Sequence, residues 1–244
     1  MRIGLVSDIH GNDVALEAVA ADLERFDPDV VVSLGDVAQG GAEPAASLDR
    51  LRALETRNVL GNSDAFLLEI PENSPEPLTE RALEVREWSL ARLDQAHLDF
   101  IRSFEPTVEV EAAGHRILCF HGSPMSYDDV LLAEWKGATL APYERADDVD
   151  LLAGGHTHTQ WARSVGEALF VNPGSVGLAY DRHVAEEDLT LAPVAEYALV
   201  FVDDLGVSVE FRRVAYPVEK LRSAIRSSGR PYADEFAAEG RDTP

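Results

Sequence analysis

The sequence predicts an α/β fold whose sheet contains parallel strands, and three observations support this prediction. Apolar runs of four to six residues recur with polar residues at their ends, which is typical of central strands in a covered sheet. Helical patterns separate the first runs, and alternating strands and helices imply parallel pairing. From residue 107 onward the chain is richer in strand patterns, with a hairpin turn expected at Ala113-Gly114.

The expected elements follow in chain order. The strands are 2–8, 29–36, 58–62, 116–122, 150–156 and 168–174, with a closing hairpin of 196–204 and 207–216. The helices are 13–26, 43–54 with Pro44 near its first turn, 78–104 as one long or two consecutive helices, and 217–228. Three prolines in residues 71–77 predict a loop there. A polar, frayed tail is expected from about residue 228.

Composition limits the classes of function. The 44 acidic and 21 basic residues give a formal net charge of −23, which disfavours duplex nucleic acid and anionic membranes as partners. Solubility or adaptation to salt would also explain this charge. No repeat or sharp composition shift divides the chain, so residues 1–244 are interpreted as one domain. The N-terminal apolar stretch is too short for a signal peptide, so a cytoplasmic protein is expected, and a homo-oligomer stays open.

Metal-capable side chains stand at the ends of five successive apolar runs. They are Asp8 and His10, then Asp36, then Asn62 and Asp64, then His121, then His156 and His158. Ligands of open α/β sheets bind outside the carboxyl ends of the strands, so we expect these side chains at one edge of the sheet. One metal-capable side chain at the end of an apolar run means little, whereas five successive runs that end in this way indicate a shared metal site.

The ligand types narrow the choice of metal. Carboxylate, imidazole and one amide oxygen, without a thiolate, suit manganese, iron or zinc and argue against a structural zinc of the cysteine type. Seven ligands are too many for one such ion, whereas two ions that share a bridging carboxylate would use them all. We therefore expect two divalent ions, with Mn²⁺ favoured and iron, zinc or nickel as alternatives.

As an ordered set, these run ends resemble the five motifs of the calcineurin-like metallophosphoesterase family. The motifs are Asp8-Ile-His10, Gly35-Asp36, Gly61-Asn62-Ser63-Asp64, His121-Gly122 and Gly155-His156-Thr157-His158. The segment NPGSVG at residues 172–177 resembles the small bacterial and archaeal phosphodiesterase branch of that family. The resemblance implies a four-layer α/β/β/α sandwich with two central mixed sheets.

The resemblance also implies a role for each ligand. Asp8, His10 and His158 would bind the first ion, Asn62, His121 and His156 the second, and Asp36 would bridge them. A water that bridges both ions would attack phosphorus in line with the leaving oxygen, while Asn62 stabilises charge on the phosphoryl oxygens. The expected substrate is a small phosphodiester or phosphomonoester.

Position 63 departs from the family pattern. Many members have a histidine there, which the following acid holds and which protonates the leaving group, whereas this chain has Ser63 followed by Asp64. A serine hydroxyl has too high a pKa to serve as that acid at neutral pH. We expect a preference for good leaving groups, or a proton delivered by water or a nearby residue, with Asp64 still in the catalytic set and Ser63 beside the substrate.

One further residue and three further functions are considered. Arg182 could grip a substrate phosphate with two hydrogen bonds, or it could be an ordinary loop residue. The alternatives to a small phosphoesterase are a phosphoprotein phosphatase or dinucleotide polyphosphate hydrolase, and a non-catalytic metal or nucleotide sensor. A DNA nuclease is disfavoured because the sequence has no basic stripe.

Overall fold

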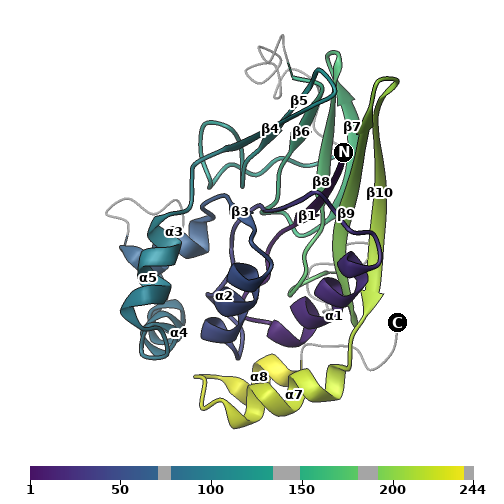
Figure 1. The fold of residues 1–244 in the computed structure, drawn as a ribbon. Helices are drawn as coiled ribbons and strands as arrows, with labels where there is room; N and C mark the ends of the chain where they lie inside the picture. The colour runs from purple at the N-terminus through teal and green to yellow at the C-terminus, as the bar shows by residue number, and fades with distance from the viewer. Residues whose placement is uncertain (71–77, 134–148, 181–191, 239–244) are drawn as a thin grey trace.

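The computed structural model describes residues 1–70, 78–133, 149–180 and 192–238, whose strands form two sheets (Figure 1). The first sheet has the order β10 (Gly206–Ala215), β9 (Val194–Asp203), β1 (Arg2–Val6), β2 (Val30–Ser33) and β3 (Arg57–Asn58). The strands β1, β2 and β3 are parallel, and β9 and β10 run antiparallel to their neighbours. The parallel pairing predicted for the first three runs is confirmed.

The second sheet is also mixed. Its order is β4 (Val108–Ala112), β5 (His115–Cys119), β6 (Leu151–Ala153), β8 (Ala168–Pro173) and β7 (Gln160–Val165). The three central strands are parallel, and β4 and β7 add antiparallel edges. The hairpin between β4 and β5 turns at Ala113 and Gly114, which both have positive φ, so the predicted turn is confirmed.

Apolar side chains fill the space between the two sheets. Leu5 and Val200 of the first sheet and Ile117 and Val171 of the second are all fully buried in one cluster. Burying one such side chain contributes about 1.5 to 3 kcal/mol, so this layer holds the sheets face to face. Leu152 of β6 and Phe170 of β8 point to the opposite face of the second sheet and pack with Trp161.

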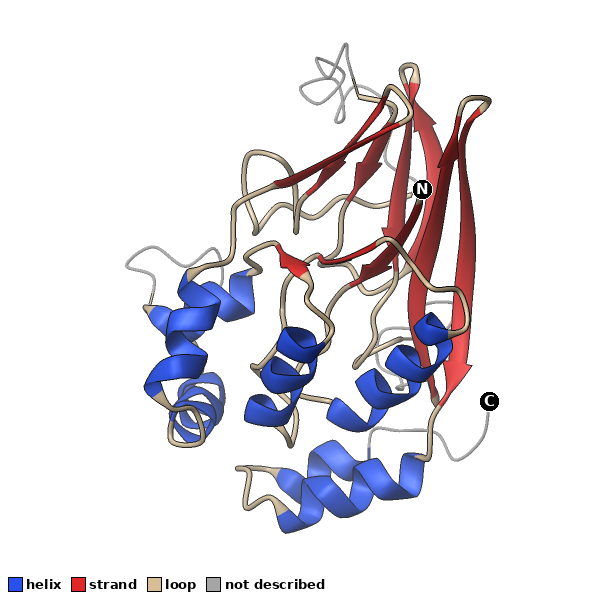
Figure 2. Cartoon of the chain, in the orientation of Figure 1, coloured by secondary structure: helices blue, strands red, loops and turns tan. Residues whose placement is uncertain are grey.

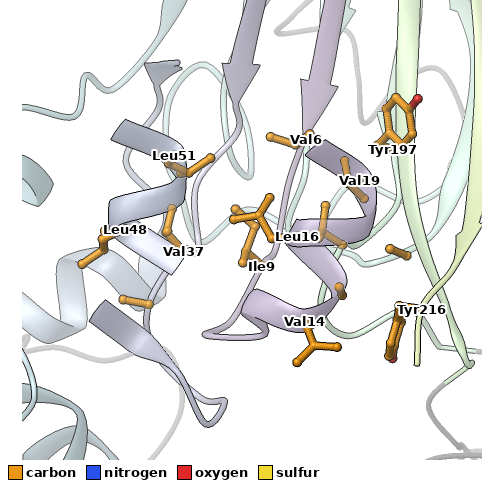
Figure 3. Packing of buried hydrophobic residues seen from close by; sticks show 14 of the residues in the cluster. Val6, Ile9, Val14, Leu16, Val19, Val37, Leu48, Leu51, Tyr197 and Tyr216 are labelled. Atoms are coloured by element: carbon orange, nitrogen blue, oxygen red, sulfur yellow. The ribbon is translucent and has the colours of Figure 1, made fainter. Parts of the chain in front are cut away.

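Helices cover the other face of the first sheet (Figure 2). The helix α1 (Asp13–Glu24) begins where Asn12 accepts a hydrogen bond from Ala15 N at 3.0 Å, and α2 (Pro44–Ala53) begins with a proline. Figure 3 shows Leu16 and Val19 of α1 and Leu48 of α2 among the buried residues of this face. Within the described ranges no helix is long and apolar enough to cross a membrane.

Of the two alternatives predicted for residues 78–104, one long helix or two consecutive helices, the structure has two helices. After α3 (Asn62–Leu68), the chain forms α4 (Glu80–Leu90) and α5 (Gln95–Arg102). The break has a physical cause, because Asp94 caps α5 by accepting a hydrogen bond from His97 N at 3.0 Å. The predicted loop 71–77 lies outside the described residues.

The expectation of a frayed tail from about residue 228 is wrong for residues 229–238. After α7 (Val218–Ser227), the chain forms a second C-terminal helix, α8 (Ala233–Ala238), which packs against α7. Arg230 is only 9% exposed and donates a hydrogen bond to Gly40 O at 2.6 Å. Ala233, Phe236 and Ala237 pack against the helical core and hold the segment in place. The sequence around them is mostly polar, so the prediction did not include this packing.

Candidate metal centre

The predicted strand ends converge where the parallel strands of both sheets terminate. Asp8 follows β1, Asp36 follows β2, Asn62 opens α3 after β3, His121 follows β5, and His156 follows β6. The parallel pairing continues past the strands, because Asp8 N donates to Gly35 O at 3.0 Å. The structure brings all seven predicted metal ligands together.

One group of ligand atoms surrounds Nε2 of His158. This atom lies 3.1 Å from Nε2 of His10 and 3.3 Å from Oδ1 of Asp8. Nε2 of His10 is also 3.6 Å from Oδ2 of Asp36. Atoms that bind one ion at about 2.1 Å lie about 3 to 3.5 Å apart, so this group has the spacing of a metal site.

A second group surrounds Nε2 of His121. This atom lies 2.9 Å from Oδ1 of Asn62, 3.2 Å from Nδ1 of His156 and 3.5 Å from Oδ1 of Asp36. Asp36 therefore has one carboxylate oxygen facing each group. Of the seven ligands, Asp36 was the one predicted to bridge, and its two oxygens lie where a shared ligand would be needed.

Backbone carbonyls orient three of the four histidines. His10 Nδ1 bonds to Gln39 O at 2.8 Å, His121 Nδ1 to Leu34 O at 2.7 Å, and His158 Nδ1 to Leu178 O at 3.0 Å. Since a carbonyl oxygen only accepts, each Nδ1 must carry the hydrogen. Each Nε2 is thereby directed into the site, as metal-binding histidines require.

Asp8 supplies a direct test of whether an ion fits. Its Oδ2 accepts hydrogen bonds from Ser7 Oγ at 2.6 Å and from His156 N at 3.1 Å. Its Oδ1 is buried without a hydrogen-bond partner. A buried carboxylate oxygen without a donor is costly, and a bound cation next to His158 would satisfy it. The residues present therefore fit a divalent ion.

Burial and charge shift the pKa values of the ligands. Burial lowers the pKa of His10 and of His156, which favours the neutral form that binds metals. Burial acts to raise the pKa of Asp36, but His121 outweighs it and holds the pKa below the usual range. Burial acts to lower the pKa of His121, but the carboxylates of Asp36 and Asp8 outweigh it and raise the pKa to about 10. Without an ion, these carboxylates thus favour the protonated form of His121.

The backbone of the site is strained. Among the described residues, nine besides glycine have positive φ, and five of these are predicted ligands. They are Asp8 at 54°, His10 at 48°, Asp36 at 58°, His156 at 67° and His158 at 54°. Each costs on the order of 1 kcal/mol, and such strain gathers at functional sites because the surrounding contacts impose it.

Two glycines allow the close approach of backbone segments. A Cβ at Gly61 would overlap the Asp36 side chain, and a Cβ at Gly177 would overlap Ile9 O. The segment NPGSVG thereby lies against the first ligand loop, where Ser175 Oγ donates to Asp8 O at 2.7 Å.

Comparison with known proteins agrees with this geometry. A protein-family model described as a calcineurin-like phosphoesterase superfamily domain matches residues 1–192. The chain belongs to the calcineurin-like phosphoesterase superfamily. An uncharacterized protein from Methanocaldococcus jannaschii is 24% identical over 231 residues, which cover 91% of each chain. Membership supports phosphoester hydrolysis as the general activity and divalent metals as the cofactors.

Two solved structures confirm the fold class. A metallophosphoesterase from Sphaerobacter thermophilus is 26% identical, with a TM-score of 0.71 over 99% of this chain and 100% of that chain. A hypothetical protein from Pyrococcus horikoshii has a TM-score of 0.78 at 15% identity, over 97% and 96% of the two chains. The α/β fold with two mixed sheets is the metallophosphoesterase fold, as the motifs implied.

The segment after Gly61 makes contacts that the sequence analysis did not predict. Ser63, expected beside the substrate, donates from Oγ to Asp36 Oδ2 at 2.7 Å and from N to Asp36 Oδ1 at 2.8 Å. Asp64 is fully buried and accepts from the backbone N–H groups of Asp36, Val37 and Gly61. Burial and the charge of Asp36 raise the pKa of Asp64 to about 7. Arg182 lies outside the described residues.

The sequence analysis did not predict how Ser7 and Asn172 hold the loops of the candidate site. Ser7 holds Asp8, as described above, and Asn172 donates to Gly155 O at 2.7 Å and to Thr157 Oγ1 at 3.0 Å. These contacts fix the loop that carries His156 and His158. The signal was present in the sequence, because a small polar residue lies beside each ligand motif or in NPGSVG, but such residues are too common to single out.

Proposed function

We propose that the protein hydrolyses small phosphodiesters, and more weakly phosphomonoesters, with two divalent ions of which Mn²⁺ is favoured. The observation that carries this proposal is Asp36, which places one oxygen 3.6 Å from His10 Nε2 and the other 3.5 Å from His121 Nε2. A single ion would need only one of these two groups.

The residues of the site would have three roles, which are metal binding, substrate binding and positioning. Asp8, His10 and His158 would hold one ion, Asn62, His121 and His156 the other, and Asp36 both. When bound, the ions supply an activated water at neutral pH and neutralise phosphate charge. The carbonyl of Asn62 faces His121, so its amide nitrogen can donate to a phosphoryl oxygen. Ser63 and Asp64 hold Asp36 and so contribute by positioning.

Charge supports diesters over monoesters. The chain has a net charge of −23, and a diester carries one negative charge where a monoester carries up to two, so long-range repulsion favours the diester. The backbone of Tyr127 and Asp129 approaches Gly122, the residue after His121. The loop that follows His121 turns back onto Gly122 and exposes Met125, Tyr127 and Val130, which could contact an organic group of the ester.

The test is metal removal and replacement. Protein stripped with a chelator should regain hydrolysis of bis-p-nitrophenyl phosphate when Mn²⁺ is added, and less so with Ni²⁺, Zn²⁺ or Mg²⁺. Hydrolysis of p-nitrophenyl phosphate should be slower under the same conditions. Asp36→Ala should abolish the restored activity, and Ser89→Ala, a buried serine of α4, should keep it.

Two results would overturn the proposal. Binding of two ions without turnover of either ester would favour the metal or nucleotide sensor. Preference for a phosphopeptide or a dinucleotide polyphosphate over both small esters would favour the alternative hydrolases.

A further inference from the structure

The two metal-binding carboxylates are held in different ways. Asp8 takes both of its hydrogen bonds on Oδ2, from Ser7 Oγ and His156 N, and leaves Oδ1 without a partner. Asp36 takes one hydrogen bond on each oxygen, and both come from Ser63. Oδ1 of Asp8 therefore has no hydrogen bond and can bind one ion. Oδ1 and Oδ2 of Asp36 each accept one hydrogen bond and keep a lone pair, so each can bind a different ion.

Ser63 reaches the two oxygens of Asp36 with two different groups. Its backbone N–H bonds to Oδ1, the oxygen that faces His121, and its hydroxyl bonds to Oδ2, the oxygen that faces His10. A histidine side chain at this position could not reproduce the hydroxyl bond at the same reach. The hydroxyl hydrogen is already committed to Asp36, which removes it from any leaving group.

We propose that Ser63 is a positioning residue that sets the orientation of Asp36 across the two ligand groups and so sets the affinity of the ion bound by Asp8, His10 and His158. This inference rests on the proposed two-ion function. It replaces the idea that Ser63 marks a lost proton donor or a substrate contact.

The geometry predicts an asymmetric effect of removing the hydroxyl. In Ser63→Ala the backbone N–H still holds Oδ1 toward His121, while Oδ2 loses the donor that orients it toward His10. Residues that orient a ligand from outside the metal's own shell typically contribute 10- to 100-fold to metal affinity. The ion of the Asp8 group should therefore weaken by about 10- to 100-fold, and the ion of the His121 group should keep its affinity.

Asp64 supports the same function from the other side. Its Oδ2 accepts from Asp36 N at 2.7 Å and its Oδ1 from Val37 N at 2.9 Å, which fixes the backbone of Asp36 at a φ of 58°. Backbone and carboxylate of Asp36 are thus both held by consecutive residues at the start of α3. The pair Ser63-Asp64 acts on a metal ligand, not on the leaving group.

The experiment measures metal binding apart from turnover. Calorimetric titration of the chelator-stripped protein with Mn²⁺ should show two ions bound to the wild type and one weakened ion in Ser63→Ala. Electron paramagnetic resonance at two equivalents of Mn²⁺ should show coupled pairs in the wild type and mainly isolated ions in Ser63→Ala. Ser63→Thr, which keeps the hydroxyl, should restore both signals, and Ser89→Ala should match the wild type.

Hydrolysis gives a second readout that separates positioning from proton donation. At a Mn²⁺ concentration that only just saturates the wild type, Ser63→Ala should lose activity by the same factor on aryl and on alkyl diesters. A loss confined to alkyl esters, whose leaving groups need a proton, would show that Ser63 acts on the leaving group and would overturn the inference.

The remaining outcomes are also decisive. Two tightly bound, coupled ions in a folded Ser63→Ala protein would overturn the inference whether or not the wild type is an enzyme. A wild type that binds two ions but hydrolyses nothing would remove the proposed function and leave the affinity test of Ser63 intact. A wild type that binds only one ion would overturn both.

Discussion

Two buried carboxylates, Asp22 in the helical layer and Asp36 in the metal centre, show how the same group serves two purposes. Asp22 accepts hydrogen bonds from Tyr197 Oη at 2.8 Å, Arg212 Nη2 at 2.9 Å and Arg25 Nη1 at 2.8 Å. Asp36 has no arginine or lysine partner among the described residues, and its contacts are Ser63, His10 and His121. Arginine side chains balance the charge of Asp22, whereas histidines, which also bind cations, face the charge of Asp36.

The difference explains how stability and function are separated in this chain. A buried charge that loses its partner is destabilising, so Asp22 and Arg212 should matter for folding. The ligand groups keep strained φ angles and a carboxylate oxygen without a donor, which the folded protein tolerates because its two cores supply the stability. The following predictions test this separation.

The largest effect is expected for Asp36→Asn. This change keeps the size of the side chain but removes the shared anionic ligand, so hydrolysis of bis-p-nitrophenyl phosphate in saturating Mn²⁺ should fall by more than about 100-fold in kcat/KM. The free energy of unfolding of the metal-free protein, measured with urea, should fall less than in Asp22→Asn. A larger loss of metal-free stability in Asp36→Asn would contradict the comparison.

The next largest effect is expected for Asp22→Asn, and it concerns stability. The variant leaves Arg212 without its buried carboxylate partner, and hydrogen bonds to charged groups contribute about 1.5 to 3 kcal/mol, so the free energy of unfolding should fall by about 2 kcal/mol. Urea titration of the metal-free protein measures this loss. The kcat/KM of the metal-loaded variant should equal that of the wild type, and a loss of activity without loss of stability would show coupling between the two regions.

Much of the fold could be predicted from the sequence, because its signals are local. Apolar runs with polar ends gave the central strands, and the first three pair in parallel as expected. The break between α4 and α5 and the helix α8 depend on a cap at Asp94 and on contacts of Phe236 with the distant helical core. Such long-range packing leaves little trace in a short window of sequence.

The convergence of the candidate metal ligands was predictable for a similar reason, and their detailed contacts were not. Each ligand follows a strand or opens a helix, and the ends of parallel strands meet in space. The contacts of Ser63 and Asp64 could not be predicted, because they depend on the φ of Asp36 and on the close approach of Gly61. Side-chain identity shows which atoms are available, whereas backbone geometry decides which atom each one meets.

A third buried carboxylate, Glu196, lies between the two extremes and should give the protein a pH-dependent stability. It is 8% exposed, and its one arginine partner, Arg213 at 3.1 Å, has a side chain that is 59% exposed. Burial outweighs Arg213 and raises the pKa of Glu196 from the ordinary 4.5 to about 7. Between pH 4.5 and about pH 7, Glu196 binds more protons in the folded state than in the unfolded state. The free energy of unfolding therefore falls as the pH rises through this range.

The measurement compares urea unfolding of the wild type and Glu196→Gln at pH 4.5 and pH 8. The wild type should lose about 2 to 3 kcal/mol more than the variant on going to the higher pH, since one pKa unit corresponds to about 1.4 kcal/mol. Equal pH dependence in the two proteins would show that Glu196 is as well compensated as Asp22.

The smallest effect is expected for Arg25→Ala. This variant tests whether burial determines how much an arginine partner contributes to the free energy of unfolding. Arg25 and Arg212 bond to the same carboxylate at similar distances, but their side chains are 71% and 27% exposed. Water and salt screen the exposed pair, so Arg25→Ala should lower the free energy of unfolding by less than about 0.5 kcal/mol. Arg212→Ala should cost several times more, because it removes the less exposed arginine, which donates to the buried Asp22 carboxylate. Equal losses in the two variants, measured by urea titration at the same ionic strength, would mean that the number of partners and not their burial stabilises Asp22.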